Sequence, residues 1–262
     1  MGILNVTPDS FSDGGLFVDI DLAVQRAHEM CEQGADIIDI GGESTRPGAE
    51  AVSGDEELAR VLPVIKALVD AGIDAKISID TRRSQVARAA IGAGAHIWND
   101  VTALSFDEDS ISVAAELACP IVLMHMQGAP ETMQDKPLYE NVVDEVYHYL
   151  ENRIDNCVRG GVLKDNITID LGIGFGKRLD DNLALLEALD SFHALGCPIL
   201  MGTSRKSFIG KIDNSAADAR LGGSLASALW AASLGASILR VHDVQETVQA
   251  VEVWHAIRKI KK

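Results

Sequence analysis

The 262-residue chain has few cysteines, no excess of basic charge and no long apolar run. Its four cysteines are far apart and form no CxxC pair, so no cysteine zinc site is expected. The net charge of −16 excludes a global basic footprint for nucleic acid. No apolar run is long enough to cross a membrane, and no signal peptide opens the chain. These absences predict a cytoplasmic protein with reduced, structural cysteines.

What the sequence does contain is a repeated alternation of short apolar strands and amphipathic helices. Strands that are apolar on both faces are typical of a parallel sheet covered by helices. The predicted strands are Gly2–Thr7, Ala35–Gly41, Lys76–Thr81, His96–Val101, Pro120–Met126, Ile167–Gly172, Pro198–Thr203 and Ser237–His242. The predicted helices are Ile20–Gln33, Glu56–Ala71, Ser84–Ala93, Asp109–Ala118, Tyr139–Arg159, Asn182–Leu195, Ala217–Leu234 and Val244–Lys259.

About eight β–α units in roughly 250 residues match a (β/α)8 TIM barrel of the α/β class. A doubly wound sheet has the same local pattern, so the alternation alone leaves both folds open. No linker divides the chain, which predicts a single domain over residues 1–262. Several predicted helices end on a glycine, which suits a left-handed C-terminal cap. These glycines are Gly34, Gly72, Gly94, Gly160 and Gly235.

Polar side chains stand where the apolar strands finish, and in a closed barrel these ends meet at one mouth. The longest non-periodic segments, residues 8–19, 42–55, 127–138 and 204–216, also follow strands. Carboxylates and amides in the set suit a flat heterocycle, whereas the cations suit an anionic group. The set consists of Asn5, Thr7, Glu43, Ser44, Thr45, Asp80, Asn99, Asp100, His125, Asp170, Ser204, Arg205, Lys206, Arg240 and His242.

A glycine-rich segment, Gly172 to Lys177, has some likeness to a nucleotide-binding loop. A P-loop needs glycine at position 171 and serine or threonine at 178, where this chain has Leu171 and Arg178. The Rossmann pattern needs glycine at position 177. Nucleotide binding by this segment is therefore not expected.

Seven motifs in order resemble the dihydropteroate synthase family over nearly the whole chain. They are Asn5–Gly15 (NVTPDSFSDGG), Gly41–Gly48 (GGESTRPG), Ser78–Thr81, Trp98–Asp100, Met124–Gly128, Ser204–Phe208 (SRKSF) and Arg240–Asp243. The resemblance implies a TIM barrel, a homodimer, and transfer of a pterin-methyl group from a pterin diphosphate to p-aminobenzoate, with Mg²⁺ and release of pyrophosphate. Three positions depart from the usual pattern: Leu171 replaces a proline, Thr203 replaces an aliphatic residue, and the chain starts directly on the first strand.

The same resemblance implies a role for each matching residue. Asp80, Asn99, Asp170 and Lys206 are expected to hold the pterin, in a slot lined by Val101, Met124 and Phe175. Asn5, Thr45, Arg240 and His242 are expected to hold the diphosphate, and Asn5 with Asp13 the Mg²⁺. Phe11, Arg46, Pro47 and Ser204 are expected to frame p-aminobenzoate. Five of these residues are expected to act in catalysis: Asp80, Asp170, Lys206, Arg240 and His242.

The chemistry implied by the resemblance is loss of diphosphate from the pterin methylene, followed by attack of the aryl amine. Asp80 and Asp170 are expected to stabilise the cationic pterin, and no general base is needed because the amine is neutral at pH 7. Two other functions stay open: a catalytically silent pterin-binding paralogue, and a methyltetrahydrofolate-using methyltransferase. The intact first and second motifs argue against a silent paralogue, and the Ser204–Arg205–Lys206 motif with the p-aminobenzoate frame argues against the methyltransferase, which needs neither. The long polar segment of the first motif suits a mobile lid over a working site.

Overall fold

The computed structural model describes residues 1–7, 20–43, 52–128, 133 and 137–259. Within them, eight strands form one parallel sheet in sequence order, each paired with the next. The strands are β1 (Gly2–Asn5), β2 (Ile37–Gly41), β3 (Lys76–Asp80), β4 (Ile97–Asp100), β5 (Ile121–Met124), β6 (Ile167–Asp170), β7 (Ile199–Met201) and β8 (Ile238–Leu239). A parallel bridge between Gly2 and Val241 joins the last strand to the first. The backbone N–H of Ile3 donates to the Val241 carbonyl at 3.0 Å, so the sheet closes into a barrel.

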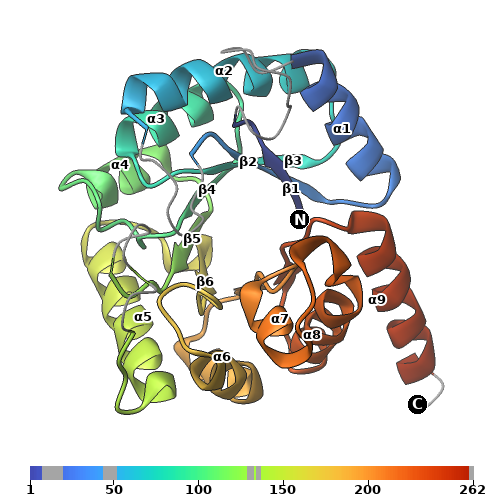
Figure 1. Ribbon diagram of the computed structural model, residues 1–262. Coiled ribbons are helices and arrows are strands. Elements are labelled where there is room, and N and C mark those ends of the chain that lie inside the picture. The colour runs from blue at the N-terminus through green and yellow to red at the C-terminus, as the bar shows by residue number, and fades with distance from the viewer. Residues whose placement is uncertain (8–19, 44–51, 129–132, 134–136, 260–262) are drawn as a thin grey trace.

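The helices lie outside the strands, as Figure 1 shows in a view along the barrel. They are α1 (Ile20–Glu32), α2 (Gly54–Asp70), α3 (Ser84–Gly92), α4 (Ser110–Leu117), α5 (Val142–Arg159), α6 (Leu179–Glu187), α7 (Ser207–Asp213), α8 (Leu221–Ser233) and α9 (Val244–Lys259), with 3-10 helices η2 (Lys164–Asn166), η3 (Leu189–Leu195) and η4 (Ala217–Ala219). The predicted TIM barrel is therefore confirmed and the doubly wound alternative is excluded. No described helix is long and apolar enough to cross a membrane.

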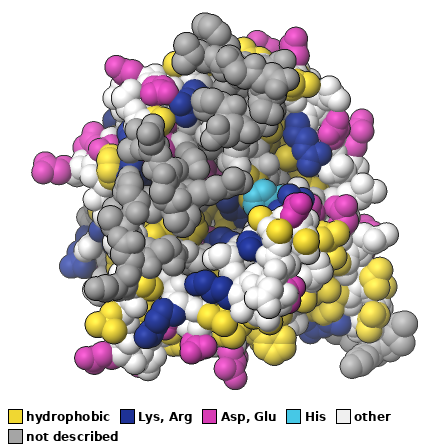
Figure 2. Space-filling model, viewed as in Figure 1, with side chains coloured by type: hydrophobic (Ala, Val, Ile, Leu, Met, Phe, Trp, Pro, Cys, Tyr) yellow, Lys and Arg dark blue, Asp and Glu magenta, His cyan; other side chains and the backbone are white. Residues whose placement is uncertain are grey.

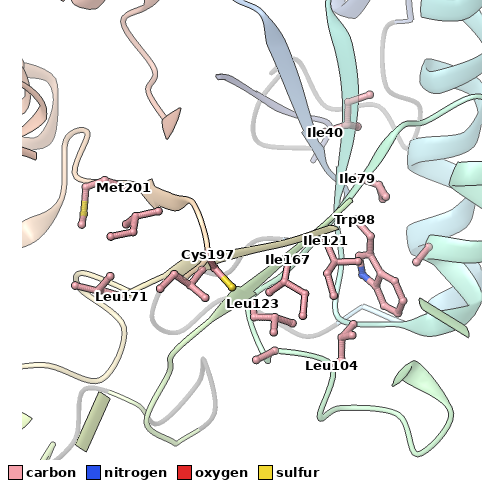
Figure 3. Packing of buried hydrophobic residues seen from close by; sticks show 14 of the residues in the cluster. Ile40, Ile79, Trp98, Leu104, Ile121, Leu123, Ile167, Leu171, Cys197 and Met201 are labelled. Atoms are coloured by element: carbon pink, nitrogen blue, oxygen red, sulfur yellow. The ribbon is translucent and has the colours of Figure 1, made fainter. Parts of the chain in front are cut away.

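The main hydrophobic core lies between the barrel and its helices (Figure 3). Alternate residues of each strand face outward into this layer, as strand geometry requires. Trp98 on β4 is fully buried there, and its Nε1–H donates to the Thr81 carbonyl at 2.8 Å. Trp98 thus packs between the barrel and its helices. Cys119, Cys157 and Cys197 are buried, and these and Cys31 are free thiols.

Three local predictions differ from the structure. Residues 204–216 were expected to lack periodic structure, yet they contain α7, a short helix with a glycine inside it and polar residues on both sides. The predicted left-handed cap at Gly160 has φ of −79°, and Gly161 takes that conformation instead, with φ of 99°. The helix predicted over Asn182–Leu195 is α6 followed by the 3-10 helix η3, because the chain tightens after Glu187. The other four predicted cap glycines have positive φ.

Candidate active site

Polar residues of the first four strands lie side by side at the carboxyl end of the barrel. The strand register pairs Asn5 with Gly41, Gly41 with Asp80, and Asp80 with Asn99. Paired residues of neighbouring strands point to the same side of the sheet, so these four positions form one ring inside the mouth. Gly41 keeps this ring open: a Cβ there would lie 3.4 Å from Asn5 Oδ1 and 3.8 Å from Asp80 Cβ.

Arg240, which follows β8, links this ring to the layer beneath it. Its Nε–H donates to Asp39 Oδ2 at 2.6 Å, and a terminal nitrogen donates to Asp80 Oδ2 at 2.8 Å. Asn99 Nδ2 also donates to Asp39 Oδ2, at 3.1 Å. Burial raises the pKa of Asp80 to about 7, with Arg240 opposing the rise and the nearby carboxylates adding to it. One guanidinium therefore serves two carboxylates that lie close together.

Asp170 and Lys206 lie on the other side of the mouth. Asp170 ends β6, and its Oδ1 accepts the backbone N–H of Gly172 at 2.8 Å. Burial raises the pKa of Asp170, and Lys206 opposes that rise. Burial also lowers the pKa of Lys206 to about 8, although Asp170 favours its charged form. Lys206 Nζ donates to the Ile173 carbonyl and lies 4.7 Å from the centre of the Phe175 ring.

The segment after β6 folds around a buried lysine. Lys177 is 1% exposed, and its Nζ lies 2.9 Å from the Gly172 carbonyl, 3.1 Å from the Phe175 carbonyl and 2.9 Å from His125 Nδ1. Burial lowers the pKa of Lys177 to about 7 and that of His125 to about 3, so the imidazole is neutral. This amine holds the backbone that carries Asp170 and Phe175. The lysine thus has a structural task, which agrees with the absence of a nucleotide-binding pattern.

His242 and Ser204 pair at the edge of the mouth, between the ends of β7 and β8. Ser204 is buried, and its Oγ accepts the His242 backbone N–H at 3.2 Å and lies 3.0 Å from His242 Nδ1. The neighbouring Arg205 donates from Nε to Asp243 Oδ2 at 3.0 Å, so these two residues form an ion pair. Figure 2 shows one histidine beside several Lys and Arg side chains near the middle of this face.

The apolar slot residues take inward positions on neighbouring strands. Met124 ends β5 in register with Asp170, and Val101 follows β4; both are buried but lie outside the main core cluster. Gly202 leaves space between two cations, because a Cβ there would lie 3.8 Å from Lys206 Nζ and 3.9 Å from Arg240 Cβ. The structure therefore brings apolar walls, carboxylates and cations together around one opening.

Five predicted site residues lie outside the described part of the chain: Phe11, Asp13, Thr45, Arg46 and Pro47. The start of the segment that carries three of them is described. There Glu43 accepts from Arg82 at 3.0 Å and from Arg83 at 2.9 Å, and its Oε1 accepts the Val52 backbone N–H at 3.3 Å. Glu43 is thus held by two arginines and by the Val52 backbone, and it is not a free mouth residue.

No cluster of three or more His, Cys, Asp or Glu side chains suits a metal within residues 1–7, 20–43, 52–128, 133 and 137–259. Such a cluster is not required for Mg²⁺, which often takes one or two protein oxygens together with substrate phosphates. Asn5 offers an amide oxygen of this kind at the mouth, close to the space above Gly41. The donor chemistry of Asn5 therefore fits the ion expected from the sequence.

Sequence reasoning missed two residues that organise the site. Asp39 lies in the middle of β2 between isoleucines, and a carboxylate inside an apolar strand was a signal that could have been read. Lys177 was considered only as part of a glycine motif, and its burial depends on contacts with His125, 52 residues away. Because His125 is 52 residues away, the sequence around Lys177 gives no indication that this lysine is buried.

Comparison with known proteins agrees with this site. Residues 1–242 match the family model described as "Pterin binding enzyme". The dihydropteroate synthase of Escherichia coli K12 is 49% identical over 262 residues, which cover 100% of this chain and 92% of that protein. The Yersinia pestis dihydropteroate synthase, solved as a complex with a sulfonamide drug, superposes with a TM-score of 0.93 at 45% identity, covering 98% of this chain and 93% of that one. The Xanthomonas albilineans enzyme in complex with 7,8-dihydropteroate gives 0.88 at 44% identity, covering 98% and 92%.

The chain belongs to the family of pterin-binding enzymes, as the closed barrel and the polar mouth already suggested. Within that family, the similar proteins that it matches from end to end are dihydropteroate synthases, which are transferases. The resemblance stated from the seven sequence motifs is thereby confirmed.

Proposed function

We infer that the chain is a dihydropteroate synthase, which condenses 6-hydroxymethyl-7,8-dihydropterin diphosphate with p-aminobenzoate to form 7,8-dihydropteroate and pyrophosphate in folate biosynthesis. The main support in the structure is the opening bounded by Asp80, Asn99, Asp170 and Lys206, which carries acceptors, an amide and a cation over apolar walls. A solved relative at 44% identity holds the product, 7,8-dihydropteroate.

We propose that the pterin enters this opening edge-on. Asp170 would accept two parallel N–H bonds from the amino-pyrimidine edge, because a carboxylate suits such a bidentate donor. Lys206 would donate to the ring carbonyl and nitrogen, and Asn99 would bind a further edge. Val101, Met124 and Phe175 would contact the ring faces.

The diphosphate would lie at the rim, near the residues that follow β1 and β8. Arg240 and His242, together with Asn5 and Thr45, would hold it and stabilise the charge that develops as it leaves. Mg²⁺ held by Asn5 and Asp13 would supply further neutralisation of that charge. Phe11, Arg46, Pro47 and Ser204 would frame p-aminobenzoate, although Ser204 already contacts His242 and so would reach it from that side.

Bond breaking would run ahead of attack, since the pterin ring can delocalise a positive methylene. Asp80 and Asp170 would stabilise that cation, and the neutral aryl amine would attack without a general base.

The decisive assay mixes pterin diphosphate, p-aminobenzoate and Mg²⁺ and measures pyrophosphate release. A silent paralogue or a methyltetrahydrofolate-using methyltransferase releases none, so the absence of release would contradict the synthase function.

We further propose that the chain forms one domain over residues 1–262 and acts as a homodimer in the cytoplasm. Support for the dimer is the apolar surface over α6, α7 and α8, where Leu183, Ile212 and Trp230 are 40%, 59% and 50% exposed. Light scattering on the purified protein, with an Ile212→Asp variant for comparison, tests this state. A wild-type protein that remains monomeric at micromolar concentration would contradict it.

A further inference from the structure

Asp39 is a charged residue in a place where charges are costly. It stands in the middle of β2, is fully buried, and has isoleucines on both sides in the sequence. The strand register pairs it with Ile3 and Ser78, so it faces the barrel interior one layer below the ring of Asn5, Gly41 and Asp80. Its Oδ1 has no hydrogen-bond partner among the described residues.

Among the described residues, the other Asp39 oxygen accepts hydrogen bonds from two members of the proposed pterin diphosphate site. Oδ2 accepts from Arg240 Nε at 2.6 Å and from Asn99 Nδ2 at 3.1 Å. These two side chains come from β4 and from the end of β8, and 201 positions separate Asp39 from Arg240. One carboxylate oxygen thus holds Asn99, which is proposed to bind the pterin, and Arg240, which is proposed to bind the diphosphate, at a common point below the mouth.

Stability alone does not explain such a residue. Replacing a buried ion pair by apolar residues of similar volume is often neutral or stabilising, and a buried oxygen without a partner adds a further cost. A guanidinium is a planar fork, so fixing Nε determines where its two terminal nitrogens point. The Asp39 carboxylate below Arg240 therefore orients the two terminal nitrogens of the guanidinium toward the mouth.

We propose that Asp39 is a positioning residue of the synthase reaction, which keeps Arg240 and Asn99 in place while Arg240 exchanges its second partner, Asp80, for the substrate diphosphate. The inference rests on the proposed function. In the structure, Arg240 bridges Asp39 and Asp80. When the diphosphate arrives, the contact with Asp39 persists, and Asp80 is left free to face the cationic pterin.

The test compares Asp39→Asn with Ser78→Ala. Asparagine keeps an oxygen acceptor and removes only the charge. Ser78 is the register partner of Asp39, is equally buried, and its Oγ also has no partner among the described residues, so it is a matched control outside the site. We expect Asp39→Asn to raise KM for pterin diphosphate about 10-fold, because the hydrogen bond from Arg240 keeps an acceptor but loses the negative charge that strengthens it. KM for p-aminobenzoate should stay near the wild-type value, and Ser78→Ala should leave both unchanged.

A pH profile adds a readout that a merely structural role would not move. The charged groups around Asp80 are Arg240, Asp39, Glu57 and Asp100. Without the Asp39 charge, Arg240 acts on Asp80 alone, so the acid limb of kcat/KM should move to lower pH by about one unit. If Asp39→Asn leaves both the acid limb of kcat/KM and the KM for pterin diphosphate unchanged, the inference is overturned. A wild-type protein that releases no pyrophosphate would instead overturn the proposed function.

If Asp39→Asn does not fold, the wild-type protein still decides the matter by NMR. The Arg240 Nε–H signal, assigned by its loss in Arg240→Lys, should exchange slowly with solvent and persist at saturating pterin diphosphate. Rapid exchange in the free protein, or loss of the signal on binding, would show that Asp39 does not hold the guanidinium and would overturn the inference.

Discussion

Asp80→Asn should remove one contribution to the pH dependence of the free energy of unfolding, measured without substrate. An aspartate in the unfolded chain titrates near 3.8, whereas burial raises the pKa of Asp80 in the fold to about 7. Between these values the folded state keeps a proton that the unfolded state has lost, so the free energy of unfolding falls as pH rises. Over roughly three pH units at 1.36 kcal/mol each, the loss from this one group is at most about 4 kcal/mol.

The measurement is urea unfolding of wild type and Asp80→Asn at intervals from pH 4 to pH 8. The variant lacks the titrating carboxyl, so its stability relative to wild type should rise steadily across this range and level off above pH 7. Asp100 is also buried, and burial raises its pKa to about 6, so both proteins should share a smaller decline from that group. Curves that run parallel from pH 4 to pH 8 would refute an elevated pKa at Asp80.

Other expected outcomes concern activity and packing. Burial lowers the pKa of Lys206 to about 8, so kcat/KM should decline above that pH as the amine loses its proton, and a flat profile to pH 10 would contradict its role as a cationic donor. Lys177→Met leaves buried carbonyls without a donor and should lower the free energy of unfolding by about 2–4 kcal/mol and weaken pterin binding, as urea melts and calorimetry would show. Trp98→Phe loses the hydrogen bond to the Thr81 carbonyl and should cost about 1–3 kcal/mol of stability with KM unchanged; a changed KM would mean that Trp98 reaches the site. A sulfonamide should inhibit in competition with p-aminobenzoate, and inhibition that excess p-aminobenzoate cannot relieve would contradict the proposed frame.

The local sequence was a sufficient guide to the strands and most of the helices. Short runs that are apolar on both faces are typical of strands in a sheet covered on both sides, and polar residues at their ends had to meet at one rim once the sheet closed. Asp80, Asn99 and Asp170 were placed correctly at that rim for this reason. The sequence did not indicate helix α7, because a seven-residue helix between polar residues has too few turns to show a period.

The pairing within the site depended on tertiary structure. Nothing near Arg240 in the sequence indicates that it contacts Asp39 and Asp80, because those contacts exist only when β8 closes onto β1. The burial of Lys177 against His125 likewise needs β5 and β6 side by side. Sequence by itself determined which residue types stand at the strand ends, since alternation and polarity are local properties. Which of those charges neutralise each other was decided by barrel closure, because electrostatic partners are chosen by distance in space and not along the chain.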